Sequence, residues 1–239
     1  MSIAVEEKTE KKWSYLRILV DSFCQVQKLR IQTSNRISAI ERETDAEGLN
    51  LDVRYLSKMY DQLALMEQNL ELNIKDEVKE HIAWGWLKKV KGIGPILAGK
   101  MLSFIDINEA DTISALWRYA GYAVVDGKAE KPTKGEKLHY NSRLKTTMYL
   151  VATSFLKSKG KFSEIYYREK ERQQEISTKD MSDLQIHYRA LRKMVKVFLG
   201  CLWLYWRQAE GLPIREPYSH EYLGHTTLYL PEEFEEKGA

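Results

Sequence analysis

The sequence contains little cysteine, proline or glycine: two Cys, five Pro and 13 Gly among 239 residues. Cys24 and Cys201 lie far apart in apolar surroundings and show no metal-binding spacing, so we expect two reduced, buried thiols. The scarcity of Pro and Gly argues against a β-sandwich or a disordered chain. Helix-forming residues dominate instead. We therefore expect an all-α fold.

Long hydrophobic runs and ligand clusters are also missing. No apolar stretch reaches the ~18 residues of a membrane span, and Met1–Glu10 is charged, unlike a signal peptide. Phe198–Trp206 is strongly apolar but short, which indicates a core helix. We expect a cytoplasmic protein with no cofactor and no metal, because the histidines lack ligand spacing. Those histidines are His81, His139, His187, His220 and His225.

Charge is distributed unevenly. The net charge of the whole chain is only +3. Residues 81–160 hold 13 Lys and Arg against six Asp and Glu, a net +7, which leaves −4 for the rest. A basic middle region between acidic arms is typical of a module that binds phosphate. We therefore expect the partner to be DNA, either duplex or branched, or structured RNA.

The first of three expected segments, residues 1–80, is a helical arm. Apolar residues recur at helical spacing from Lys11 to about Thr44, and again from about Leu51 to Val90, with a break at Asp45–Gly48. In the second stretch they approach a heptad seam. The pattern predicts an antiparallel hairpin or a coiled coil, and we favour a homodimer through these helices. The seam consists of Leu56, Tyr60, Leu63, Leu70, Ile74 and Val78.

The second segment, residues 81–212, is the expected binding domain. A polar loop is predicted at Asp126–Lys137, and Gly211-Leu212-Pro213 should end the last helix. The third segment, 213–239, is expected to be an irregular tail with an acidic end, packed by Tyr218, Tyr222, Leu228 and Tyr229. Helices of the second segment are predicted at Asp111–Gly121, Tyr140–Ser158, Ser163–Ile176 and Ser182–Ala209.

A helix-hairpin-helix motif is indicated at Val90–Met101. One helical stretch runs into Gly92-Ile93-Gly94, and a second begins at Pro95. We expect both glycines to allow positive φ, Ile93 to fill the groove between the helices, and Pro95 to take the first helical position. The free N–H groups of the second helix would then face an anion, beside the positive end of the helix dipole.

Lysines surround this turn and continue along the downstream loop. Such a surface fits the sugar-phosphate backbone and does not distinguish bases. The expected nucleic-acid contacts are Lys88, Lys89, Lys91, Gly92, Ile93, Gly94, Ile96, Lys100, Lys128, Lys131, Lys134, Lys137, Arg143 and Lys145.

The order of motifs from the hairpin onward resembles the carboxy-terminal transposase domain of the bridge-RNA-guided insertion-sequence transposases, the insertion-sequence one-ten group. The resemblance covers roughly half the chain. It rests on Gly92-Ile93-Gly94-Pro95, Ser114–Tyr122, Asn141–Lys145, Phe162–Arg168 and a closing helix at His187–Leu204. It implies a helical DNA-binding domain that takes part in transposition and recombination.

Two departures from that family argue against catalysis. The family carries a ribonuclease-H-like domain with four acidic residues, whereas Met1–Val90 shows only helical periodicity. Its catalytic serine belongs in a loop that here, at Val124–Thr133, has Asp126-Gly127 in place of Ser-Gly. Ser142, beside Arg143 and His139, is a weak alternative nucleophile, and Asn141-Ser142 also fits a helix N-cap. We name no other catalytic residue.

Three functions stay open. The first is a non-catalytic, largely sequence-independent DNA-binding protein derived from a transposase. The second is an active recombinase that uses Ser142. The third is a helical scaffold. Aromatic side chains can stack on unpaired bases, but we expect most of the candidates to lie in the core: Trp84, Trp86, Trp117, Tyr119 and Tyr122.

Overall fold

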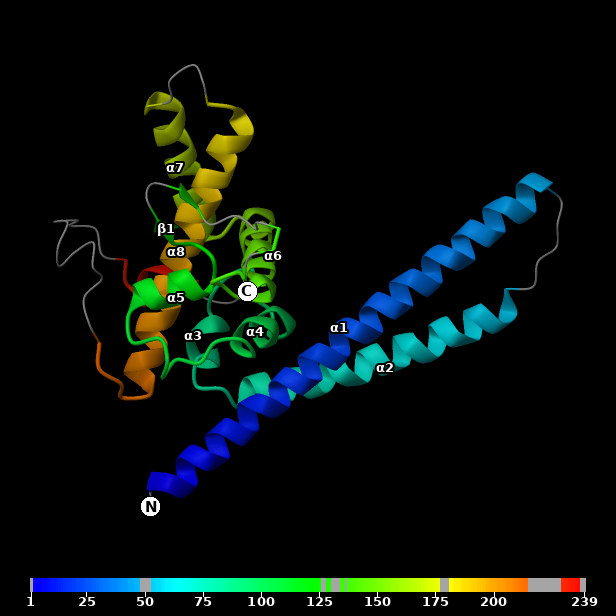
Figure 1. Cartoon of the computed structure of the whole chain (residues 1–239), viewed down its shortest axis with the longest axis horizontal. Coiled ribbons are helices and arrows are strands. Elements are labelled where there is room, and N and C mark those ends of the chain that lie inside the picture. The colour runs from blue at the N-terminus through cyan, green and yellow to red at the C-terminus, as the bar shows by residue number, and fades with distance from the viewer. Residues whose placement is uncertain are drawn as a thin grey trace. The chain divides into compact units, whose positions relative to one another are not determined.

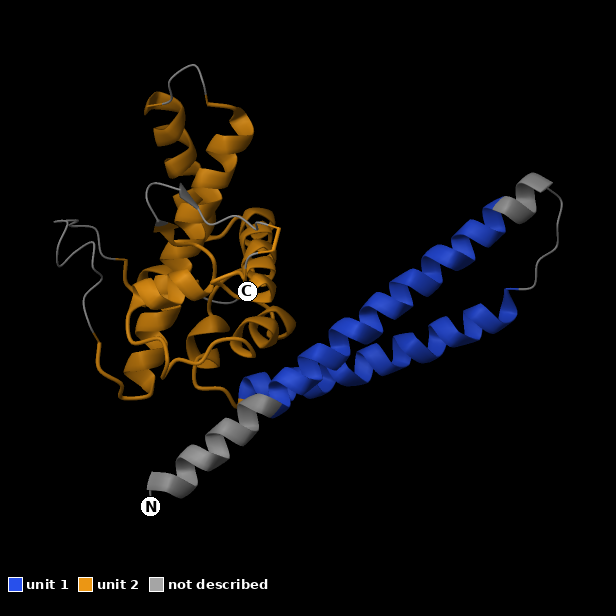
Figure 2. Ribbon diagram, viewed as in Figure 1, with its two compact units in different colours: residues 1–79 blue, residues 80–239 orange. Residues whose placement is uncertain are grey.

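In a computed structural model the chain divides into two compact units, residues 1–79 and 80–239 (Figure 2). The structure describes residues 2–47, 53–125, 128–129, 134–135, 137–176, 181–214 and 229–236, with backbone only at 2–14, 43–47, 125, 128 and 129. Within these ranges every regular element is helical except one pair of two-residue strands, so the all-α expectation is confirmed. No helix in the described ranges is long and apolar enough to cross a membrane.

Unit 1 consists of two helices, α1 (Ser2–Glu47) and α2 (Arg54–Lys79), which pack against each other (Figure 1). The Arg30 guanidinium forms an ion pair with the Glu67 carboxylate, and the Gln27 amide donates a hydrogen bond of 2.9 Å to the same carboxylate. Because the Glu67 side chain is only 12% exposed, these donors offset the desolvation of its charge. Gly48, expected to end the first helix, lies outside the described residues.

The apolar stripe of α2 faces inward. Leu63, Ile74 and Val78 are buried, and the other seam residues are partly buried. However, α2 ends at Lys79, so the expected continuous helix to Val90 is wrong. The buried His81 ring accepts a hydrogen bond of 3.1 Å from the Ala83 amide through Nδ1. Such side-chain bonds to nearby backbone compete with helix formation.

Unit 2 contains six α-helices in the described ranges, and local sequence signals set several of their ends. The Thr112 hydroxyl caps one start, Ser182 and Gln185 form a capping box at another, and Gly211 (φ 69°) ends the longest helix. The helices are α3 (Trp84–Leu87), α4 (Pro95–Leu102), α5 (Ile113–Tyr119), α6 (Ser142–Ser158), α7 (Lys161–Ile176) and α8 (Asp183–Ala209), with a 3-10 turn, η1 (Pro231–Phe234). Strands β1 (Val124–Val125) and β2 (Lys128–Ala129) pair in antiparallel fashion.

The core of unit 2 forms around α8, which contacts α3, α5, α6, α7 and η1. Trp86 stacks on Phe198 at 5.8 Å between ring centroids, and Phe155 stacks on Phe162 at 4.8 Å. Arg207 is buried, and its guanidinium donates to the carbonyls of Ile107, Ala110 and Pro213. These bonds fix the segment between α4 and α5 onto α8.

The tail is not irregular throughout, contrary to expectation. Residues 229–236 pack on the helices of unit 2 through Phe234, which is buried and stacks on Phe162 with 4.1 Å between ring centroids and 13° between planes. The Trp86 indole donates a hydrogen bond of 2.9 Å to the Pro231 carbonyl. Of the residues expected to pack the tail, Tyr229 has its ring centroid 5.9 Å from that of Phe234. The others, Tyr218, Tyr222 and Leu228, lie outside the described residues.

Candidate nucleic-acid interface

The hairpin turn lies between α3 and α4 and is fixed against α6. Gly92 has φ 97°, a value that favours glycine. Its carbonyl accepts a hydrogen bond of 2.6 Å from the Ser154 hydroxyl. A Cβ at Gly92 would lie 2.7 Å from the Ser158 Oγ and 3.2 Å from the Phe155 ring. Gly92 is therefore required by packing and backbone conformation together.

Gly94 has a different role. Its φ is −98°, so the expectation of positive φ at this position is wrong. It is the N-cap residue of α4, it is exposed, and a Cβ built on it meets no atom within 4 Å. Pro95 occupies the first turn of α4, as expected. The outward side of the turn is thus open, and Ile93 is buried behind it.

The first turn of α4 presents backbone donors. The first intrahelical bond runs from the Ala98 amide to the Gly94 carbonyl, at 3.0 Å. The N–H groups of Ile96 and Leu97 precede it, and helix geometry gives them no partner. Both residues are partly exposed. Since the positive end of the helix dipole lies here, an anion placed beside Gly94 would be stabilised by two backbone N–H groups.

The lysines near this turn differ in what they contact. Lys88 and Lys91 are exposed and have no ion pair within the described part of the chain. Lys100 is partly buried in the last turn of α4. The Lys89 ammonium, by contrast, pairs with the Glu235 carboxylate at 3.0 Å. Lys89 would therefore have to exchange Glu235 for a phosphate, and its role as a phosphate contact stays a prediction.

The acidic end of the tail also forms hydrogen bonds with the Lys89 backbone and with Lys161. The Glu236 amide donates a hydrogen bond of 2.9 Å to the Lys89 carbonyl. The Glu236 carboxylate accepts a hydrogen bond of 2.7 Å from the Lys161 amide at the start of α7. The Lys161 ammonium in turn donates to the carbonyls of Glu233 and Glu235. One side of the hairpin is thus covered by the tail.

A second basic group lies at the other end of α6. The Arg143 guanidinium lies over the Phe104 ring at 4.7 Å, and the Lys145 ammonium lies over the Tyr140 ring at 4.2 Å. These cation–π contacts hold both side chains at the start of α6. Ser154, which binds the hairpin turn, follows Lys145 along the helix by roughly 14 Å. The hairpin turn and the pair Arg143 and Lys145 therefore lie near opposite ends of α6.

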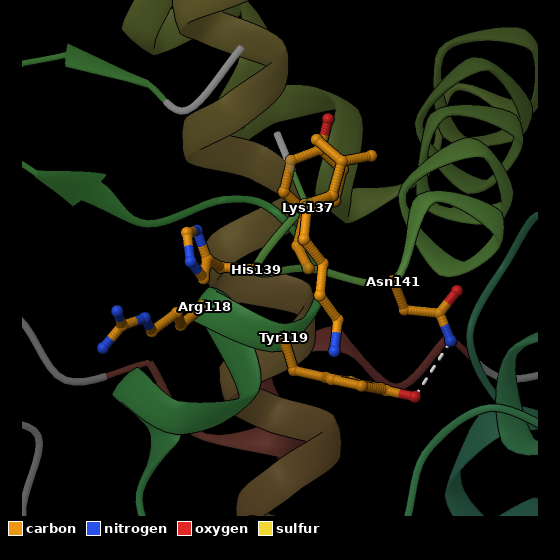
Figure 3. Close-up of a pocket in the computed structure, with 7 residues that line it drawn as sticks. Arg118, Tyr119, Lys137, His139 and Asn141 are labelled. Carbon is orange, nitrogen blue, oxygen red and sulfur yellow. Dashed lines mark hydrogen bonds between the residues drawn. The ribbon is translucent and has the colours of Figure 1, made fainter. Parts of the chain in front are cut away.

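The structure describes the side chains of only two of the four lysines in the loop that leads to α6. Lys134 and Lys137 are exposed. The Lys128 side chain and Lys131 lie outside what the structure describes, as does the Asp126-Gly127 step. Lys137 lines an open hollow of about 610 Å³ between α5 and α6, together with Arg118, Tyr119, His139 and Asn141 (Figure 3). Of these residues only Lys137 was an expected contact.

Of the five aromatic candidates, one lies in the core, three are partly buried and one is exposed. Trp86 is fully buried, and Trp84, Trp117 and Tyr122 are partly buried. Tyr119 is 41% exposed. Helical periodicity alone did not single it out, because Tyr119 is the last residue of a seven-residue helix. Its position before Ala120-Gly121, where α5 ends, was the available signal.

Ser142 occupies the first position of α6 and is exposed. The Asn141 carboxamide oxygen accepts 3.0 Å hydrogen bonds from the Arg143 and Leu144 amides, so the expected N-cap is confirmed. Across the described residues, no group of three His, Cys, Asp or Glu side chains is arranged to hold a metal ion.

Comparison with protein-family models, curated proteins and solved structures found no match to this chain. The resemblance to transposases therefore stands on the sequence motifs alone.

Proposed function

We propose that this chain is a cytoplasmic, non-catalytic DNA-binding protein, derived from a transposase, that holds duplex or branched DNA by its phosphate backbone. One observation carries the proposal: the open first turn of α4, where Gly94 leaves space and the Ile96 and Leu97 amides lack helical partners. A phosphate oxygen fits two such N–H donors. The resemblance in sequence supports the same function.

Lysines beside the turn supply the long-range attraction. Lys88 and Lys91 both precede it on the chain and are exposed. Each phosphate that a lysine neutralises releases condensed counterions, so binding must weaken as salt rises. Base edges are not contacted in this arrangement, which makes affinity largely independent of sequence. Arg143 and Lys145 offer a second point of contact further along α6.

The test is the salt dependence of duplex binding, measured by fluorescence anisotropy. The logarithm of affinity should fall linearly with the logarithm of salt concentration, by ~0.9 for each neutralised phosphate. Lys91→Ala should reduce that slope by about one. Lys58→Ala is the matched control, because Lys58 is also exposed but lies on α2 of unit 1. Equal effects of the two substitutions, or affinity independent of salt, would contradict the proposal.

A further inference from the structure

The hollow between α5 and α6 is lined by an exposed aromatic ring and by two cationic side chains, Arg118 and Lys137. Its volume is about 610 Å³, and it is open to solvent. Its wall includes Arg118, Tyr119, Lys137, His139 and Asn141, which come from the end of α5 and the segment that leads into α6 (Figure 3). Among the residues that the structure describes, no carboxylate lines it. The described parts of the chain also contain no ion pair of Arg118 or Lys137.

Tyr119 is held in place from two sides. The Asn141 amide donates to the Tyr119 carbonyl at 2.8 Å, and the Asn141 Nδ2 donates to the Tyr119 hydroxyl at 2.9 Å (Figure 3). Asn141 is itself fixed, because its Oδ1 caps α6. An exposed ring fixed in this way loses little further freedom when a ligand stacks on it, which favours binding.

We propose that this hollow binds one unpaired nucleotide of a nucleic-acid strand, with the base on the Tyr119 ring and the adjoining phosphate on Arg118 and Lys137. The proposal rests on the proposed function, since the rest of the strand is held by the hairpin and its lysines. Stacking on aromatic rings tolerates every base, because each base has a π face. Within a duplex both faces of a base are covered by its neighbours, so only an unstacked nucleotide can occupy the ring.

The experiment compares two probes on the full chain: a plain duplex, and the same duplex with one bulged 2-aminopurine. The wild-type chain should bind the bulged probe about tenfold more tightly and quench its fluorescence, as expected for stacking on one aromatic ring. Tyr119→Ala should abolish both the preference and the quenching while duplex affinity is kept. Tyr119→Phe retains the ring and should keep both. Tyr188→Ala is the matched control, because Tyr188 is 51% exposed and lies on α8, outside the hollow.

Four results would overturn the inference, and they are distinguishable. Equal affinity for both probes, unaffected by Tyr119→Ala, removes the nucleotide site and leaves the proposed function intact. Equal weakening of both probes by Tyr119→Ala would mean that the ring contacts duplex. Failure to bind either probe removes the proposed function as well. Free 2-aminopurine riboside monophosphate serves as a last arm: binding as tight as that of the bulged duplex would make the hollow a site for free nucleotides and refute a strand-borne ligand.

Discussion

The Lys89 ammonium lies 3.0 Å from both carboxylate oxygens of Glu235, a residue 146 positions further along the chain. If the hairpin binds phosphate, this contact competes with it. Glu235→Gln should therefore free Lys89, raise duplex affinity about threefold and steepen the salt slope by ~0.9. Glu232→Gln is the matched control, because it removes the same charge from an exposed neighbour in η1. Identical gains in the two variants would show that only total charge matters.

The two hairpin glycines should respond to substitution in opposite ways. Gly94→Val should cost at most about 1 kcal/mol of stability through the N-cap, because its Cβ points into open space. It should lower duplex affinity about tenfold or more by keeping phosphate from the α4 amides. Gly92→Ala should destabilise the fold by about 2 kcal/mol, because of φ 97° and the close Ser158 Oγ. Thermal unfolding and anisotropy on both variants separate these effects, and full affinity in a folded Gly94→Val variant would place the contact elsewhere.

These glycines also illustrate what sequence can and cannot predict. Pro95 at the start of α4, the Asn141 cap and Gly211 after α8 were predictable, because caps and turns depend on residues close in sequence. The role of Gly94 was missed because positive φ was assigned to both glycines, whereas Gly94 has the extended backbone of an N-cap residue before a proline. The end of α2 was missed because the residues up to Val90 keep helical periodicity, and only the folded chain shows His81 bonding to Ala83.

Long-range contacts explain the other errors. The tail was expected to be irregular and to pack through tyrosines and Leu228, but Phe234, which was not among the expected residues, stacks on Phe162. The pairing of Lys89 with Glu235 depends on that contact. The position of the exposed Tyr119 ring depends on a hydrogen bond from Asn141, which is 22 positions away. No local pattern in the sequence could predict these partners.

Unit 1 retains exposed apolar side chains that could join two chains. Leu65 and Leu72 are 60% and 57% exposed, and they lie one heptad apart on α2. We predict a homodimer through these helices, and Leu65→Glu should shift it toward monomer in light scattering. Leu184→Glu is the control, because Leu184 is 61% exposed but belongs to α8. A wild-type chain that stays monomeric at high concentration would contradict this prediction.

The protein should neither cleave nor join DNA on its own. Transfer of a phosphodiester to Ser142 needs a base to activate the hydroxyl and charge to stabilise the phosphorane. The Ser142 position is instead the first residue of a capped helix. Purified protein incubated with supercoiled and branched DNA, with and without Mg²⁺, should yield no nicks and no covalent adduct. An adduct that disappears in Ser142→Ala would make the recombinase the better description.

The hydrogen bond from Trp86 to Pro231 spans 145 positions, nearly the whole of unit 2. Closing so long a loop carries an entropic penalty that only the completed core offsets, so such contacts form late in folding. The hairpin therefore cannot be excised as a short peptide that keeps its shape, because Trp86 would lose Phe162, Phe198 and η1 together. Grafting the turn into another protein would require carrying its aromatic support as well.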